Sequence, residues 1–386
     1  MTYFRNRTVN LLNLHYWIHA VAVTGGSAFF VTYLLKAGVP APVTLSSFAL
    51  ILLGRFLIRP LIVPLTVRWG MRSMVITGTL LTAFQFPLLA EVDGVGTMLA
   101  LLIVVSSVGD TVYWSTYHAY FATLGDDEHR GHQIGVREAV TALVGVVSPL
   151  MTGFLLVTYG PRAAFSLATI FCIASALPLL RTPEVRVART VSGAFRASVP
   201  GMLLFVADGW IMAGYVFVWQ IALFTSLNED FLAYGGALAL AAIIGGIGSL
   251  TLGRHIDAGH GSRAVIYAFG TFSLIIVLRA VATGDATVAV LANALGALGA
   301  CLYVPTLMTA VYTPAKRAPC TLRFHVATEG GWDIGGASGL FCAALALHLG
   351  LPLWTGILMS LFGVAAMVVL LQRYYAPRPG LTYPSP

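Results

Sequence analysis

Three side chains that can carry a proton recur at every fourth residue near the C-terminal end of the chain: His325, Glu329 and Asp333. Because an α-helix completes a turn every 3.6 residues, this spacing places all three on one face, with Trp332 beside them. A carboxylate that alternates between neutral and charged forms inside a membrane is the chemistry that proton coupling requires. The alternative is a fixed ion pair with an arginine, which would lock two helices together.

A second acid lies near the middle of an apolar segment and has phenol side chains on its face. Tyr113 and Tyr117 follow Asp110 at three and seven residues. This combination of acid and phenol is suited to hydrogen bonding a polar or cationic solute. A charge at membrane depth costs about 3 kcal/mol on insertion scales, so we expect Asp110 either to have a function or to pair with Arg55 or Arg59.

Those two arginines are four residues apart and therefore share one helix face. Arginine binds a carboxylate or a phosphate through two parallel hydrogen bonds, which favours an anionic solute. The alternative is charge balance against the neighbouring acids. Arg55 is expected to lie deeper in the membrane, whereas Arg59 is close enough to a helix end for its side chain to reach water.

Five further residues are candidates for the same chemistry. His15 and His19 are one helical turn apart, a spacing that suits a transition metal, a proton relay or simple hydrogen bonding. Asp208 is followed on its face by Tyr215, which is suited either to lining a cavity or to packing. Glu138 is a candidate proton carrier, with a structural ion pair or gate as the alternative.

All of these residues lie in or beside about twelve long apolar segments. The chain is 58% hydrophobic and only 10% charged, against roughly 25% charged residues in an ordinary soluble domain. A helix needs about 20 residues to cross a hydrocarbon core of about 30 Å, and lipid cannot satisfy open backbone groups. We therefore predict an all-α integral membrane protein, with spans at 11–35, 43–67, 73–90, 96–121, 136–159, 163–180, 200–227, 234–253, 264–282, 286–312, 323–349 and 352–371.

The second half of the chain repeats features of the first half at a shift of about 190 residues. Gly109, Tyr113 and Thr116 are matched by glycine, tyrosine and threonine at 299, 303 and 306, and Glu138 falls on Glu329. Parallel repeats of this kind build one large class of transporters from two related six-helix bundles. The predicted division is a first bundle at 1–181, a linker at 182–198 and a second bundle at 199–386.

The net charge of +7 has a pattern typical of membrane proteins. Lysines and arginines gather in alternate loops, which by the positive-inside rule places both termini in the cytoplasm. We expect the chain to lie in the inner, or plasma, membrane. Nucleic-acid binding is not expected from such a pattern. The four cysteines stand singly without a CxxC pair, and no cofactor loop or nucleophile motif is recognised. We therefore expect no metal site, no cofactor and no enzyme activity.

Two loops carry related motifs with a known counterpart. Residues 65–72, LTVRWGMR, and residues 253–263, GRHIDAGHGSR, both resemble the cytoplasmic signature G-x-L-x-D-R-x-G-R-R. The second copy keeps the acid of that signature as Asp257, whereas valine or threonine stands at the corresponding place in the first copy.

Other motifs resemble further sequence features of the protein family that carries this signature. Residues 125–131 resemble its loop between the fourth and fifth helices, and Pro183 with Glu184 resembles its acidic mark after the sixth. Residues 145–149 with Gly153 resemble its helix-five antiporter pattern, although the helix-four arginine of proton antiporters is absent. On these motifs the chain resembles the major facilitator superfamily over essentially its whole length.

The resemblance implies twelve transmembrane helices in two pseudo-symmetric six-helix bundles around a central cavity. It also implies a cytoplasmic gate in which the two signature loops latch the outward-facing state. The candidate gate residues are Arg68, Gly70, Arg72, Asp257, Gly261 and Arg263.

These observations together predict a secondary active transporter that moves a small polar or charged organic solute by alternating access. Protons are the expected driving ion, with Glu329, Asp333, Asp110 and Glu138 as coupling candidates. The cavity candidates are His15, His19, Arg55, Arg59, Tyr113, Tyr117, Asp208, Tyr215, His325 and Trp332. The chain is expected to act as a monomer in the lipid bilayer. The alternatives are a multidrug or toxic-compound efflux antiporter, a transition-metal importer and a non-transporting sensor or assembly factor.

Overall fold

A computed structural model of the chain describes residues 6–124, 130–256 and 261–375. Within these ranges, the side chains of 130–139, 250–256, 261–264, 312, 313 and 316 are outside the described set. All regular structure in the described ranges is helical.

The helices divide into two sets joined by a non-helical segment, residues 180–193, which is called the linker below. The N-terminal half contains α1 (Arg7–Gly25), η1 (Ser27–Phe29), α2 (Phe30–Lys36), α3 (Ala41–Ile58), η2 (Arg59–Leu61), α4 (Ile62–Trp69), α5 (Met71–Ala83), α6 (Gln85–Ala90), α7 (Thr97–Leu124), α8 (Arg130–Thr158) and α9 (Pro161–Leu179). The C-terminal half contains α10 (Ala194–Met212), η3 (Ala213–Val218), α11 (Trp219–Ser226), α12 (Phe231–Ile256), α13 (Gly261–Val281), α14 (Ala286–Arg317), α15 (Thr321–His348), α16 (Leu353–Leu358) and α17 (Ser360–Tyr375).

Ten helical stretches of the described chain are long and apolar enough to cross a membrane, and Val265–Val281 is a shorter apolar helix. One further long helix, α15, carries Arg323, Glu329 and Asp333, which explains why it falls outside the apolar set. With it there are twelve crossings in the described residues. The prediction of an all-α protein with twelve transmembrane helices is confirmed.

Two helices begin six residues earlier than the sequence predicted. α8 begins at Arg130 and α10 at Ala194, whereas the apolar segments begin at 136 and 200. Both extensions contain polar residues, such as Arg196 and Ser198 in α10. Hydrophobicity marks only the part of a helix that lies in lipid, so helical turns that continue into water are missed.

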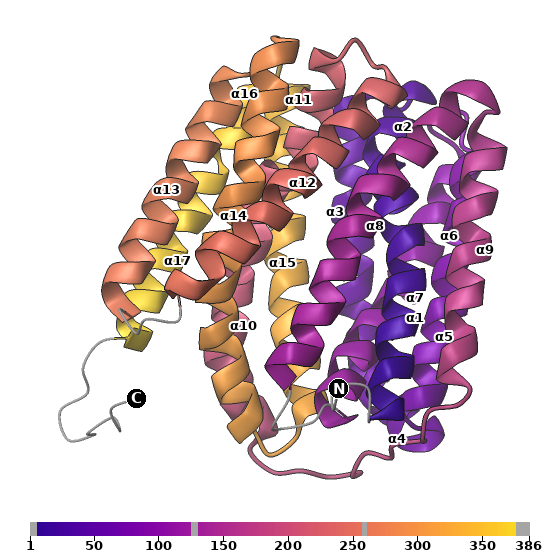
Figure 1. The fold of residues 1–386 in the computed structure, drawn as a ribbon, viewed down its shortest axis with the longest axis vertical. Helices are drawn as coiled ribbons and strands as arrows, with labels where there is room; N and C mark the ends of the chain where they lie inside the picture. The colour runs from indigo at the N-terminus through magenta and orange to yellow at the C-terminus, as the bar shows by residue number, and fades with distance from the viewer. Residues whose placement is uncertain (1–5, 125–129, 257–260, 376–386) are drawn as a thin grey trace.

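The two ends of the bundle differ in what they contain (Figure 1). The start of α1, the linker and the end of α17 lie at one end, which we call the linker end. The short connections 37–40, 91–96, 159–160, 227–230, 282–285 and 349–352 lie at the other, which we call the opposite end.

Contacts between the two halves close the opposite end. Tyr234 of α12 donates a hydrogen bond of 3.3 Å to the backbone carbonyl of Ala28. Its ring lies 5.4 Å, centroid to centroid, from the ring of Phe29. At the surface, the Lys36 ammonium is 3.5 Å from a carboxylate oxygen of Glu229.

Two pairs of long helices form the main contact between the halves, α3 with α15 and α8 with α12. In the described part of the α8–α12 contact, small residues meet: Gly145 faces the side chain of Ala242, and Gly246 faces that of Ala142. Small residues allow helix backbones in a membrane to approach closely. The α3–α15 contact is different, because it contains charged residues.

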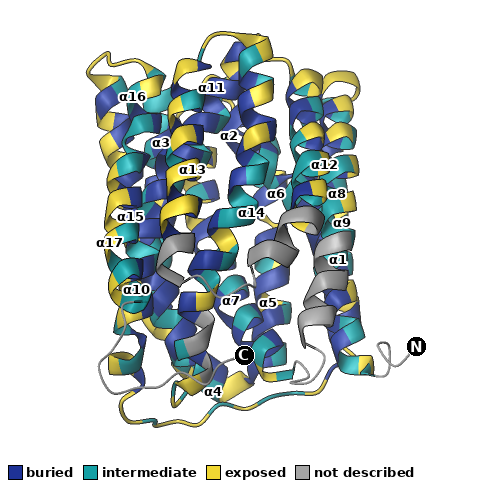
Figure 2. Ribbon diagram, turned by 60° about the vertical axis from the view of Figure 1, so that its left-hand side comes forward, coloured by how far each residue is buried: buried dark blue, intermediate teal, exposed yellow. Residues whose placement is uncertain are grey.

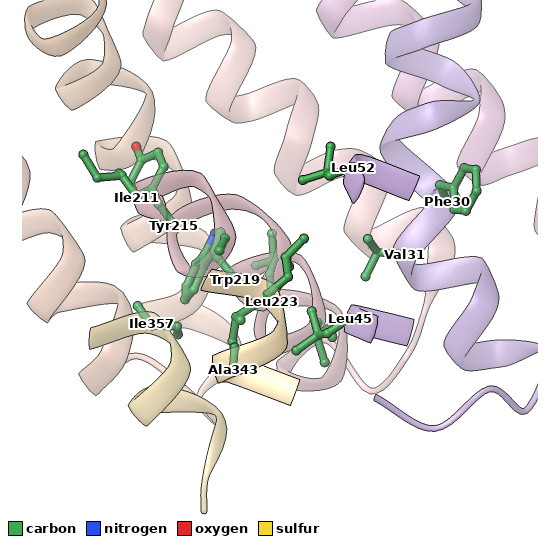
Figure 3. Packing of buried hydrophobic residues seen from close by; sticks show 14 of the residues in the cluster. Phe30, Val31, Leu45, Leu52, Ile211, Tyr215, Trp219, Leu223, Ala343 and Ile357 are labelled. Atoms are coloured by element: carbon green, nitrogen blue, oxygen red, sulfur yellow. The ribbon is translucent and has the colours of Figure 1, made fainter. Parts of the chain in front are cut away.

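Apolar side chains cover both the interior and the outer surface of the bundle. Leu45 and Leu52 of α3 pack in one core cluster with Trp219 and Leu223 of α11 (Figure 3). Many large apolar side chains are nevertheless exposed, as in the outer helix faces of Figure 2, and Phe362 is 72% exposed. An apolar exterior of this extent is suited to contact with lipid rather than water.

The internal repeat of the sequence corresponds to a repeated helix contact. Gly109 of α7 lies against the backbone of Thr82 at the α5–α7 contact, and Gly299 of α14 lies against Ile275 at the α13–α14 contact. Each glycine therefore brings the fourth helix of its half close to the third. The predicted boundaries at 1–181, 182–198 and 199–386 stay a prediction.

In the C-terminal half, α10 and α15 pack closely through their glycines. A Cβ atom at Gly335 would overlap the backbone carbonyl of Val206, and one at Gly209 would overlap the backbone of Trp332. Backbone atoms cannot rotate out of the way, so a side chain at either position would force the helices apart.

We therefore predict that Gly335→Ala lowers the free energy of unfolding by about 1–3 kcal/mol, the usual cost of overpacking. The control is Gly270→Ala in α13, where the added Cβ meets no atom within 4 Å. Thermal unfolding of the two purified variants in the same detergent gives the comparison. Equal melting temperatures would contradict the proposed close packing of α10 on α15.

Candidate functional site

Four charged side chains meet between α3 and α15, and we call them the ion cluster: Arg55, Arg59, Glu329 and Asp333. An Arg59 terminal nitrogen donates a hydrogen bond of 2.8 Å to Oε2 of Glu329, and the Arg59 Nε donates to Asp333. Arg55 Nε lies 3.0 Å from Oδ1 of Asp333. Ser115 of α7 accepts a further hydrogen bond of 2.7 Å from Arg59.

Helical spacing explains how each half presents its part of the cluster. The two arginines are one turn apart in the α3–η2 region, and the two carboxylates are one turn apart on α15. Residues at this spacing lie on the same helix face, so one contact between two helices pairs all four charges. The N-terminal half supplies both cations, and the C-terminal half supplies both anions.

Burial makes these partners depend on one another. The side chains of Arg59 and Asp333 are 3% and 0% exposed. Removing an ion from water costs several kcal/mol, and this cost is offset only when a partner and hydrogen bonds replace the water. The ion-pair alternative raised for Glu329 and Asp333 is therefore realised in this structure. Arg59 is buried and does not reach water.

A cavity of about 280 Å³ lies beside the ion cluster, between the two halves. Five of its lining residues were sequence candidates: Arg55, Asp208, His325, Glu329 and Trp332. Five others complete the lining: Trp114, His118, Phe205, Met308 and Val311. They come from α3, α7, α10, α14 and α15, so both halves contribute.

Sequence reasoning missed Trp114 and His118, although a signal for them exists. They follow Asp110 at four and eight residues, a helical stripe as regular as the one formed by Tyr113 and Tyr117. One step along a helix rotates the side chain by about 100°. Choosing between neighbouring stripes therefore requires the contacts of the helix, which the sequence does not contain.

The stripe formed by Tyr113 and Tyr117 packs inside the N-terminal half. Tyr113 and Tyr117 are buried, and neither lines the described cavity. His15 contacts the backbone carbonyl of Ser175 at 2.7 Å through Nδ1 and the hydroxyl of Tyr113 at 3.0 Å through Nε2. The His19 ring stacks on Tyr113 with centroids 4.2 Å apart. His15, His19, Tyr113 and Tyr117 form a packed polar layer between α1 and α7, and His15 extends it to the backbone of α9.

Two other candidates also lie away from the cavity lining. Asp110 forms no ion pair within 4.0 Å with Arg55 or Arg59, although both arginines act on it electrostatically. Tyr215 is buried in the C-terminal half, where its hydroxyl donates a hydrogen bond of 2.8 Å to the carbonyl of Gly296. The Arg279 guanidinium lies 4.0 Å from the centre of the Tyr215 ring.

The first signature loop contacts the linker. Gly70 has a φ of +87°, and a Cβ there would overlap the Glu184 side chain. Glu184 accepts hydrogen bonds from the backbone of Arg72 at 2.9 Å and from the Ser73 hydroxyl at 2.8 Å. Arg68 is exposed. Hydrogen bonds to Glu184 of the linker therefore hold the loop at the start of α5.

Several candidates fall outside the described set. Asp257 lies outside the described residues, as do the side chains of Glu138 and Arg263 and the surroundings of Gly261. Within the described residues, no group of three or more His, Cys, Asp or Glu side chains is arranged to hold a metal ion.

Two helical halves around a shared cavity define the architecture of a secondary transporter. The sequence model described as Major Facilitator Superfamily matches residues 16–320. The chain therefore belongs to the major facilitator superfamily, and it is a multi-pass membrane transporter of small molecules and not an enzyme. No curated protein sequence matches it.

Several solved transporter structures share this fold. The POT family transporter PepTSo matches with a TM-score of 0.74 and 10% identity, over 96% of this chain and 98% of that chain. A bacterial homologue of the iron transporter ferroportin, in an inward-facing state, matches at 0.69 and 14%, over 96% and 99%. The human organic anion transporter MFSD10 matches at 0.68 and 15%, over 95% and 99%. At such identities the likeness extends to the fold alone.

The balance of charges in the ion cluster gives a direct prediction about stability. Arg59→Met leaves an uncompensated buried carboxylate, and Glu329→Gln leaves an uncompensated buried guanidinium. Each change is expected to cost about 3–5 kcal/mol. The double variant restores neutrality, with Arg55 still paired to Asp333, and should lose much less than the sum of the two single losses.

Thermal unfolding of the four proteins in one detergent provides the double-mutant cycle. Arg162→Gln is the control, because Arg162 pairs with Glu91 at the exposed surface and its loss should leave the melting temperature nearly unchanged. Strictly additive losses for Arg59 and Glu329 would show that the two side chains do not form the pair described above.

Proposed function

We propose that the protein is a proton-coupled secondary active transporter that moves a small polar or charged organic solute by alternating access. The observation that carries the proposal is the position of the ion cluster, which joins α3 to α15 at the edge of the cavity. Glu329 belongs to both the cluster and the cavity lining. Glu329 would therefore take part both in solute binding and in the contact between the halves.

The two oxygens of Glu329 face different surroundings. Oε2 accepts from Arg59 and lies 3.4 Å from the Ser115 hydroxyl. Among the described residues, Oε1 has no hydrogen-bond partner, and it lies 4.0 Å from Nε2 of His118, which lines the cavity. A proton on Oε1 would cancel the negative charge that holds Arg59. Proton transfer at the cavity would thus weaken the tie between the halves, which makes Glu329 our first coupling candidate.

Alternating access requires the contacts at the opposite end to separate while the linker end closes. We assign the linker end to the cytoplasm of a cell with the protein in its inner, or plasma, membrane, because arginines gather at that end and the acids Glu91, Asp93, Glu229 and Asp230 lie at the other. The arrangement described here, with the opposite end closed, is then the inward-facing state. We propose that a monomer carries out the cycle.

One alternative has an observation in its favour. A multidrug antiporter would use the aromatic lining of Trp114, Phe205 and Trp332 to bind lipophilic compounds. The metal importer has less support, because both ring nitrogens of His15 contact protein groups.

Distance measurement tests alternating access without knowledge of the solute. Spin labels would be attached at Lys36 and Glu229, whose side chains are 49% and 47% exposed, in a protein whose native cysteines are replaced. We expect short and long distances in slow exchange, with the long distance gaining population as pH falls, because protonation of Glu329 removes one of the two carboxylates that bind Arg59. Glu329→Gln should keep both distances and lose the dependence on pH.

Glu91→Gln is the matched control, since it removes an exposed acid at the same end and should leave the pH response intact. One narrow distance at every pH would contradict alternating access at this end. A pH response that survives in Glu329→Gln would contradict the role given to Glu329.

A further inference from the structure

Asp208 differs from every member of the ion cluster, because no basic side chain of the described residues forms an ion pair with it. It lies on α10 and is 7% exposed. Its Oδ1 has no hydrogen-bond partner among the described residues. Trp332 of α15 lines the same cavity as Asp208.

The neighbouring cations are already used elsewhere. Arg59 binds Glu329 and Asp333, and Arg55 is paired with Asp333. The cluster is balanced with two cations and two anions, so Asp208 is a carboxyl group in excess of the available cations. A buried carboxyl in this position requires a proton or a cation from outside the protein.

Aromatic and apolar groups surround this carboxyl on the cavity side. Phe205 precedes Asp208 by three residues on α10 and also lines the cavity. Trp332, held close to α10 by the absence of a side chain at Gly209, forms another part of the wall. Met308 of α14 adds an apolar surface. Carboxylate together with aromatic faces is the combination that recognises an ammonium group, through an ion pair and cation–π attraction.

We propose that Asp208, with Trp332 and Phe205, is the subsite for the ammonium group of an organic amine whose apolar body occupies the cavity. The inference rests on the proposed transport function and narrows its solute to amines. A cavity of about 280 Å³ is at the lower end of the range for small-molecule sites, so the ligand is a small one. An amine with a single aromatic ring has the required parts.

The position of Arg55 adds a second element to the subsite. Its guanidinium lies 5.5 Å from the centre of the Trp332 ring. Arg55, Trp332 and Asp208 all line the cavity, so the cavity wall carries a cation as well as the Asp208 carboxyl. Asp208 attracts the ammonium group of a bound amine, whereas Arg55 would repel a second positive charge on the ligand.

The test compares three probes of one shape on the purified full-length protein: phenethylamine, phenethyl alcohol and phenylacetate. Binding is followed by tryptophan fluorescence, since Trp114 and Trp332 line the cavity, and by thermal stabilisation at mildly alkaline pH. We expect phenethylamine to bind and both other probes to bind far more weakly. Asp208→Asn should weaken phenethylamine binding by about thirtyfold or more, the usual effect of losing one partner of a buried charge pair.

The matched control is Asp230→Asn, which removes an exposed carboxylate from the same half. Asp230 accepts a hydrogen bond from the backbone nitrogen of Ala233, and asparagine can accept the same bond, so amine binding should not change. Asp208→Glu, which keeps the carboxylate, should retain part of the affinity.

The amine subsite is overturned if the alcohol or phenylacetate binds as tightly as phenethylamine, if none of the three binds, or if Asp208→Asn binds the amine like the unchanged protein. The first two outcomes need no variant, so the test holds even when Asp208→Asn does not fold. If the amine-binding test fails but the distance between Lys36 and Glu229 still depends on pH, the transport proposal stands. Amine binding without any distance change would overturn transport and keep the subsite.

Discussion

The organisation of this protein depends on the need of two buried arginines for two buried carboxylates. Arg55 and Arg59 lie on one half, and Glu329 and Asp333 on the other. Neither half can bury its charges alone at an acceptable cost. The halves are therefore held together by an interaction that a change in protonation or ligand can alter. An apolar contact at this place would have no such control.

The second contact between the halves has a different character, and the difference is physically useful. In the described part of the α8–α12 contact, glycine of one helix faces alanine of the other. Where such small residues meet, no long side chain has to be displaced for the helices to shift. The α3–α15 contact combines strong attraction with carboxylates, through which we propose that protons act. One contact then permits movement, and the other is suited to control when it occurs.

Much of the fold follows from the sequence, whereas the site follows only in part. Hydrophobic length predicted the twelve crossings, and four-residue spacing placed Glu329 and Asp333 on one face. The bond from Arg59 to Glu329 joins residues 270 positions apart, and no periodicity within a single helix reports such a pairing. Helix rotation was also undetermined: Trp114 lines the cavity, whereas Tyr113, one residue earlier, packs against His15 and His19.

The central claim is that Glu329 gains and loses a proton as its bond to Arg59 breaks and forms. Infrared difference spectroscopy across a pH titration measures this directly, because a protonated carboxyl has a C=O band that a carboxylate lacks. The account predicts a band that appears on acidification, is absent in Glu329→Gln and persists in Glu91→Gln. A titration that is identical in the unchanged protein and in Glu329→Gln would show that this residue keeps one charge state, and proton coupling through the ion cluster would be wrong.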